Sequence, residues 1–431
     1  MKDKGNKTKQ IAVLLCFLLL MSCIGGCNSD KREKKKEEAQ EVKIPMILTV
    51  DPSSGKKNEQ KVIDAFNQAY DGIYEVDVEW IMETEDEYRQ NLKRLNATDE
   101  LPAVITDIRM LPSFYQMMIA DGRIEDLSGY INEDTKWKNM IEPVVLNGCM
   151  EEDGSVYLAP LSTAVFSCSG IFYNEELFMQ AGIQSFPNTW EEFWDCCKKL
   201  EEQGITPLAL HTDGTAWAPM LLATAELSTD EEGEAFMKEL YPKSYQNKSG
   251  LRLADTLKRL FGYTTNDALY ADFDAAYNNF FRGEAAMLPN GYWMIDQIPQ
   301  SMTDKVRFAA FPENKLISSP ETFGWALVSD YSDEVKEGAV AFFRFRTEMN
   351  QKEKEEFLAK KAWEVSPAEA DYINAYLNQP EFVPNYQVKW NSILQEQMLD
   401  EYLPQLVTNQ MTAEEFTEMA DESVRQFEAE Q

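Results

Sequence analysis

From Ile44 onward, short apolar runs alternate with longer amphipathic segments, and this alternation constrains the fold more than any other feature. The first part predicts strands over residues 45–50, 74–81 and 101–106, with a helix over 58–69 between the first two. Strands that alternate with helices favour lobes built on largely parallel sheets. We therefore expect an α/β fold in which helices flank each sheet.

The middle of the chain continues this alternation. Short strands are predicted over 156–159, 171–173, 207–210 and 285–288. A helix over 175–181 should be stopped by Gly182, because glycine readily adopts the left-handed conformation that ends a helix.

A further helix is predicted over 189–203, with Gly204 ending it. Thr189 and Glu192 have the spacing of a capping box at its start. Its apolar residues fall on one face at helical spacing: Trp190, Phe193, Trp194, Cys197 and Leu200. We expect Cys197 to pack there as a small apolar group.

The length of the chain predicts two lobes. About 390 residues follow the N-terminal region, and a single hydrophobic core stops growing above roughly 250–300 residues.

The formal net charge of −33 argues against nucleic acid as a partner, because Lys and Arg contacts to phosphate supply most of the affinity in such complexes.

The N-terminus has the layout of a secretory signal, with several lysines before an apolar run over 11–21. That run is about half of what a membrane-spanning helix needs. The predicted signal ends in Ile24-Gly25-Gly26-Cys27. These four residues resemble a bacterial lipobox, with cleavage before a lipidated Cys27. We expect residues 1–26 to be a lipoprotein signal peptide and 27–43 to be a charged tether; the alternative is an incidental thiol after an ordinary signal.

Four of the seven cysteines follow the anchor, namely Cys149, Cys168, Cys196 and Cys197. They imply no disulfide framework, although a bridge between Cys149 and Cys168 remains open.

A series of motifs resembles family 1 extracellular solute-binding proteins, and the resemblance extends from about Ile44 to the end of the chain. The motifs are Tyr157-Leu158-Ala159-Pro160, Phe172-Tyr173-Asn174-Glu175-Glu176-Leu177-Phe178, Ala181-Gly182-Ile183, Pro187-Asn188-Thr189-Trp190-Glu191-Glu192-Phe193, Gly204-Ile205-Thr206-Pro207-Leu208, Phe281-Arg282-Gly283-Glu284-Ala285-Ala286-Met287, Asn290-Gly291-Tyr292-Trp293 and Phe323-Gly324-Trp325-Ala326-Leu327.

This resemblance implies a two-lobe fold like that of maltose-binding proteins, with three chain crossings and a ligand cleft between the lobes. Lobe 1 would comprise 44–160 plus 313–361, and lobe 2 would comprise 161–312 plus 362–431. It also implies the function of a monomeric, lipid-anchored protein on the outer face of the cytoplasmic membrane. Such a protein captures a carbohydrate and delivers it to the permease of an ABC importer, whose ATPase is a separate subunit.

Residues for catalysis are scarce. His211 is the only histidine, so two-histidine zinc motifs are excluded and a Ser-His-Asp arrangement would rest on this residue alone. No G-x-x-x-x-G-K-[ST] loop occurs, and the sequence implies no cofactor and no metal. Paired carboxylates remain open, because 74 acidic residues offer many pairs to a glycosidase.

Aromatic residues are the stronger signal, because sugars present C–H faces that can lie on an indole ring. Trp293, which follows Asn290-Gly291, matches a family position at which a Trp stacks on the sugar. Trp390 resembles a second stacking Trp, and Trp217 lies in a loop or helix start near His211. Trp325 is also a candidate, although core packing is the stronger reading for this residue.

Polar candidates lie in loops that follow predicted strands. Asp51 and Asp107 would accept hydrogen bonds from sugar hydroxyls, and Arg109 would donate to them. Asp213 and a neutral His211 complete the predicted binding residues.

Two alternative functions stay open. One is a binder of peptides or polyamines, which the acidic balance would suit, and the other is a surface glycosidase.

Overall fold

The structure is a computed structural model that describes residues 41–49, 55–81, 85–151, 153–213, 216–238, 244–319, 324–387, 390 and 394–430. The predicted signal peptide, Cys27, most of the predicted tether and Asp51 lie outside these residues. Within them, no helix is both long enough and apolar enough to cross a membrane.

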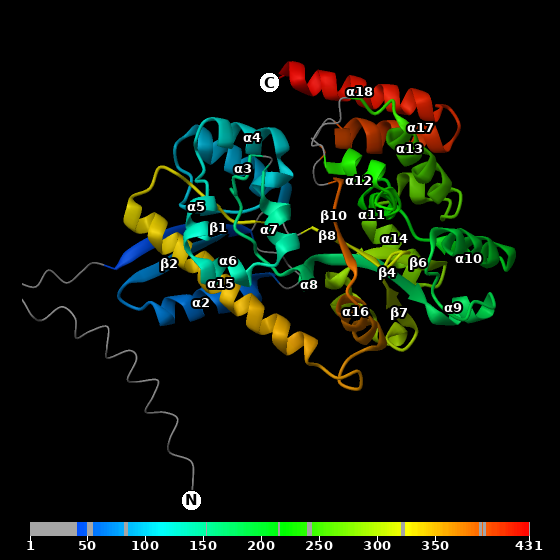
Figure 1. Cartoon of the computed structure of the whole chain (residues 1–431), viewed down its shortest axis with the longest axis horizontal. Coiled ribbons are helices and arrows are strands. Elements are labelled where there is room, and N and C mark those ends of the chain that lie inside the picture. The colour runs from blue at the N-terminus through cyan, green and yellow to red at the C-terminus, as the bar shows by residue number, and fades with distance from the viewer. Residues whose placement is uncertain are drawn as a thin grey trace, which may run out of the picture. The chain divides into compact units, whose positions relative to one another are not determined.

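The described residues form two β-sheets with helices around each (Figure 1). Ten strands are described: β1 Val42–Thr49, β2 Tyr74–Ile81, β3 Val104–Ile105, β4 Cys168–Asn174, β5 Thr206–Leu208, β6 Ala285–Gly291, β7 Val306–Ala309, β8 Lys315–Ser318, β9 Ala326–Leu327 and β10 Glu381–Pro384. The α-helices are α2 Gly55–Ala69, α3 Glu85–Ala97, α4 Pro112–Ala120, α5 Ser128–Glu133, α6 Thr135–Met140, α7 Pro143–Cys149, α8 Ala164–Ser167, α9 Glu175–Gln180, α10 Trp190–Glu202, α11 Trp217–Leu227, α12 Glu231–Lys238, α13 Lys248–Phe261, α14 Phe273–Phe281, α15 Asp333–Leu358, α16 Pro367–Leu377, α17 Leu403–Val407 and α18 Ala413–Glu430. The 3₁₀ segments are η1 Ile108–Met110, η2 Ala268–Tyr270, η3 Tyr292–Gln297 and η4 Gln300–Met302, and η6 Leu394–Tyr402 is a π-helix.

The first sheet has the strand order β2-β1-β3-β9. β1 pairs in parallel with both β2 and β3, and only β9 runs antiparallel to its neighbour. The side chains of Ile44, Met46 and Leu48 alternate along β1 and are all buried in one cluster, as the period of a strand requires. The long helix α15 packs on β1, and it runs along this sheet in Figure 1.

The second sheet has the order β10-β8-β4-β6-β5, with β7 pairing to β4 off this path. Its central strand β4 is antiparallel to β6, β7 and β8, whereas β5–β6 and β8–β10 are parallel pairs. This sheet is therefore mixed, and the expectation of a mostly parallel sheet in each lobe is wrong for it. Hydrophobic periodicity predicts that a segment is a strand but not the direction of its neighbours.

The chain changes sheets three times, between β3 and β4, between β8 and β9, and between β9 and β10. β8 still pairs with β4 and β10, so the chain leaves the second sheet after Ser318 and not at the predicted boundary between residues 312 and 313. At the predicted boundary, the chain instead makes a tight turn before β8, in which Glu313 and Asn314 have positive φ.

Two predicted strands are shorter in the structure. Only Val104–Ile105 of the 101–106 segment is a strand, and the 156–159 segment makes single bridges from Val156 and Ala159 instead of a continuous ladder. By contrast, the predicted bounds of β2 are confirmed, and Thr189 and Glu192 form the predicted capping box at the start of α10.

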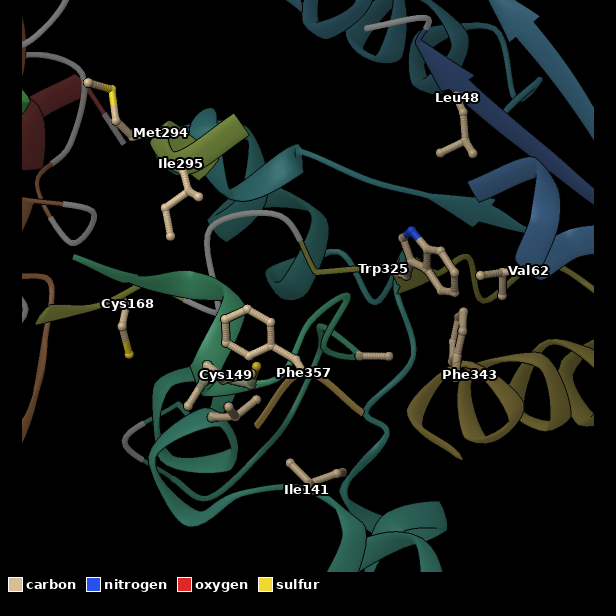
Figure 2. Packing of buried hydrophobic residues seen from close by; sticks show 14 of the residues in the cluster. Leu48, Val62, Ile141, Cys149, Cys168, Met294, Ile295, Trp325, Phe343 and Phe357 are labelled. Carbon is tan, nitrogen blue, oxygen red and sulfur yellow. The ribbon is translucent and has the colours of Figure 1, made fainter. Parts of the chain in front are cut away.

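Two large hydrophobic clusters hold most of the buried side chains. Trp325 belongs to the first, where its ring stacks on Phe342 at a centroid distance of 4.7 Å, and Figure 2 shows Phe343 and Val62 beside it. The predicted apolar face of α10 lies in the second cluster.

The four described cysteines are buried thiols, so the Cys149–Cys168 bridge is absent from the described part of the chain. Cys197 packs in the second cluster, as predicted.

Candidate functional site

Two parallel strands of the second sheet end beside each other. β5 pairs with β6 through Leu208 and Met287, and the backbone N–H of Ala209 extends the pairing by donating to the Met287 carbonyl. Because parallel strands have their carboxyl ends at the same edge of a sheet, the segments that follow β5 and β6 are brought together. The first leads to Trp217 and the second to Trp293.

The segment after β5 is fixed by hydrogen bonds to the segment before α14. The Thr212 hydroxyl donates to the Leu269 carbonyl at 2.8 Å, and the Asp213 N–H donates to the Ala271 carbonyl at 3.0 Å. These bonds place the start of α14 against the loop that carries His211.

Four aromatic side chains meet at this strand edge, and we call them the ring cluster: His211, Trp217, Phe273 and Trp293. The Trp217 ring lies 5.4 Å from the His211 ring, 5.3 Å from Phe273 and 6.5 Å from Trp293, measured between centroids. Trp217 is therefore the centre of the cluster. The planes of the two indoles are inclined by 56°, so the rings do not stack face to face.

The rings differ in their exposure. Trp293, at the start of η3, is 42% exposed, whereas His211 is fully buried. Large apolar rings usually lie inside a protein, so a half-open indole beside a second indole is a surface suited to an apolar ligand face.

His211 supplies a neutral polar group at the back of the ring cluster. Its Nδ1 lies 2.9 Å from the Asp213 carbonyl oxygen, which can only accept, so Nδ1 carries the proton. Burial lowers the pKa of His211, against the opposing effect of Asp213 and Asp272. The imidazole is therefore neutral at pH 7, and Nε2 is an acceptor.

Two of the predicted tryptophans lie in the cores and not in the ring cluster. Trp390 is 1% exposed in the second cluster, with its ring edge-on to Tyr245 and Tyr386. Trp325 is likewise 1% exposed, in the first. Neither ring presents a face to a ligand in this structure, because neighbouring side chains cover both.

The polar candidates after β3 are engaged within their own lobe. Arg89 donates to Asp107 through Nε at 2.6 Å, and both side chains are nearly buried. Arg109 donates to the Gly148 carbonyl at 3.3 Å and lies 3.8 Å from a carboxylate oxygen of Glu151. Asp107 and Arg109 thus take part in structural ion pairs. Asp213 is exposed and lies beside the ring cluster.

Phe273 is a member of the ring cluster that the sequence did not single out. Its only local signal is its place as the first residue of α14, directly after Asp272, whose side chain accepts from the Ala275 N–H and caps the helix. The hydrogen bonds from Thr212 and Asp213 that bring this helix start to the ring cluster join segments more than 50 residues apart.

A separate cavity of about 190 Å³ lies beside β10 and α12. Its lining contains none of the predicted binding residues: Ser228, Glu234, Met237, Lys238, Glu381, Phe382, Val383 and Pro384. Across the described ranges, no three His, Cys, Asp or Glu side chains gather as ligands for a metal ion.

Comparison with solved structures identifies the fold. A chitin oligosaccharide binding protein matches with a TM-score of 0.67 and 20% identity, over 89% of this chain and 98% of the other. A Streptococcus pneumoniae solute-binding protein, solved in complex with the blood group A-trisaccharide, matches with a TM-score of 0.67 and 18% identity, over 89% and 100% of the two chains. The two-lobe α/β fold predicted from the sequence is thereby confirmed.

Comparison of the sequence with known proteins identifies the family. A probable sugar-binding periplasmic protein of Rhizobium meliloti is 26% identical over 191 residues, which make up 42% of this chain and 44% of that protein. The match thus spans less than half of the curated relative. The model of the bacterial extracellular solute-binding protein family matches residues 52–352, well over half of the 431 residues. The chain therefore belongs to the bacterial extracellular solute-binding proteins, a family of binding proteins.

Proposed function

We propose that this protein captures a carbohydrate, most suitably an oligosaccharide, and delivers it to an ABC importer. The observation that carries the proposal is the pairing of a half-exposed Trp293 with Trp217 at the edge where β5 and β6 end. The proteins matched above bind a chitin oligosaccharide and a trisaccharide, as their names state, which supports the same ligand class here.

The chemistry of the ring cluster suits a sugar. The C–H face of a pyranose covers an indole and removes apolar surface from water, while its hydroxyls need polar partners. Asp213 is exposed and offers a carboxylate that accepts hydrogen bonds. An uncharged ligand also avoids the repulsion that a net charge of −33 imposes on anions.

Capture would proceed by closure of the two lobes. A ligand that gains additional contacts only in the closed form shifts the population toward that form. The closed form would then dock on a membrane permease. Since the sequence has no P-loop, ATP hydrolysis would belong to a separate subunit of the importer.

Anchoring would keep the monomeric binder near its transporter. Lipid on Cys27 stabilises membrane attachment by about 0.8 kcal/mol per buried CH₂, and the charged residues that follow would act as a tether. We propose the outer face of the cytoplasmic membrane as the location. Catalysis has no part in this proposal.

A thermal-shift panel tests the proposal. The mature chain is heated with maltotriose, xylotriose, chitotriose and monosaccharides, and with spermidine and a tripeptide for the rival ligand classes. A sugar present at 100 times its dissociation constant should stabilise the protein by about 2.7 kcal/mol. Stabilisation by spermidine or the peptide alone would overturn the sugar assignment, and release of product from a responding glycoside would favour a glycosidase.

A further inference from the structure

The Trp293 ring lies directly over the backbone of Gly291. A Cβ atom built on Gly291 would lie 2.2 Å from Cη2 and Cζ3 of the Trp293 ring and 2.6 Å from Cζ2. Non-bonded carbon atoms are at their best separation at about 3.5–4.0 Å, so even a methyl group has no room beneath the ring.

The reason for glycine at this position is space and not backbone conformation. Gly291 has φ −107° and ψ −179°, an extended conformation that any residue adopts. The neighbouring Asn290 stabilises the same turn. Its side-chain oxygen accepts from the Gly291 N–H at 2.8 Å, and its Nδ2 donates to the Met294 sulfur at 3.1 Å. Asn290 and Met294 are both fully buried, so the turn that carries Trp293 is anchored on both sides of the ring.

We propose that Gly291 is a positioning residue for ligand binding: by leaving room beneath the Trp293 ring, it sets the ring at its angle to Trp217 and keeps its outer face open. This inference rests on the proposed function, because it explains how the ring surface for the sugar is formed in advance of binding. A ring that is held before the ligand arrives loses less side-chain entropy on binding.

The expected effect of Gly291→Ala follows from the ring's exposure. Because Trp293 is half-exposed, its ring can leave by rotating to another staggered rotamer, and the fold survives. The three closest atoms to the added methyl group all belong to Trp293, so removal of the ring removes these three contacts. We therefore expect the substitution to act chiefly through Trp293.

A double-mutant cycle tests this with Gly291→Ala, Trp293→Ala and the double variant. Gly129→Ala is the matched control, because a Cβ at Gly129 would meet no atom within 4 Å and its φ is not positive. In the unliganded protein, the near-ultraviolet circular dichroism difference between wild type and Trp293→Ala isolates the signal of Trp293. Gly291→Ala should change that signal, and Gly129→Ala should leave it unchanged.

Ligand affinity gives the second readout, measured with whichever of maltotriose, xylotriose and chitotriose stabilises the wild type most. Gly291→Ala should weaken binding to the level of Trp293→Ala, and in the Trp293→Ala background it should change affinity by less than about twofold. An unaltered Trp293 signal in Gly291→Ala overturns the inference, as does an equal loss of affinity in both backgrounds. If Trp293→Ala binds the sugar as wild type does while the dichroism result holds, the proposed site fails and the positioning of the ring stands.

Discussion

The open face of Trp293 makes a quantitative prediction for the change Trp293→Ala. The residue is 42% exposed, and a Trp side chain offers roughly 200 Å² of surface, so about 85 Å² is available to a ligand. Covering that area at about 25 cal/mol per Å² contributes about 2 kcal/mol to binding. We therefore expect Trp293→Ala to raise the dissociation constant of the sugar about 30-fold.

Isothermal titration calorimetry with the best sugar of the panel provides the assay. The matched control is Trp363→Ala, which removes another indole that is 83% exposed but lies between α15 and α16, outside the ring cluster. The control should bind with wild-type affinity. Equal affinities of the Trp293→Ala and wild-type proteins would refute the assignment of the ring cluster, and an equal loss in both variants would point to a general effect on the protein.

Three further predictions concern stability. Thr189→Ala removes the capping box of α10 and should lower the free energy of unfolding by about 1 kcal/mol in urea denaturation, whereas Thr189→Ser should retain most of it. Gly170→Ala would place a Cβ 2.4 Å from Cζ of Phe308 and 2.5 Å from the Ala309 carbonyl oxygen, so we expect a loss of about 1–3 kcal/mol; an unchanged melting temperature would contradict this packing. Because burial lowers the pKa of His211, the unfolded chain takes up its proton first as the pH falls below about 6.5, and stability should decrease from there. His211 is the only histidine, so His211→Gln should remove the histidine part of this pH dependence; a slope that persists unchanged would contradict its origin.

Local sequence patterns predicted the local structure well. The bounds of β2 and the capping box of α10 follow from residues close together in the chain. The direction of the strands beside β4 and the place of β8 in the second sheet depend on pairings between distant segments. Hydrophobic periodicity shows which face of a segment is buried, but it does not show which strand the segment pairs with. It therefore could not predict that the second sheet is mixed, or that the chain leaves this sheet only after Ser318.

In the candidate site, too, local sequence predicts less than the contacts between distant segments decide. Trp217 and Trp293 follow strands that pair in parallel, so their meeting is a consequence of the sheet order. Trp390 also comes after a strand, β10, yet Tyr245 and Tyr386 pack edge-on against its buried ring. Whether a Trp is open or covered depends on residues far away in the sequence, and no local pattern encodes it.

The central claim, that this protein is a carbohydrate binder, is tested most directly by calorimetric titration of the mature chain with maltotriose, xylotriose, chitotriose and spermidine at several temperatures. The proposal predicts saturable binding of one sugar per chain, with a negative heat-capacity change as the sugar covers the Trp293 ring. Saturable heat from spermidine, with none from any sugar, would contradict it.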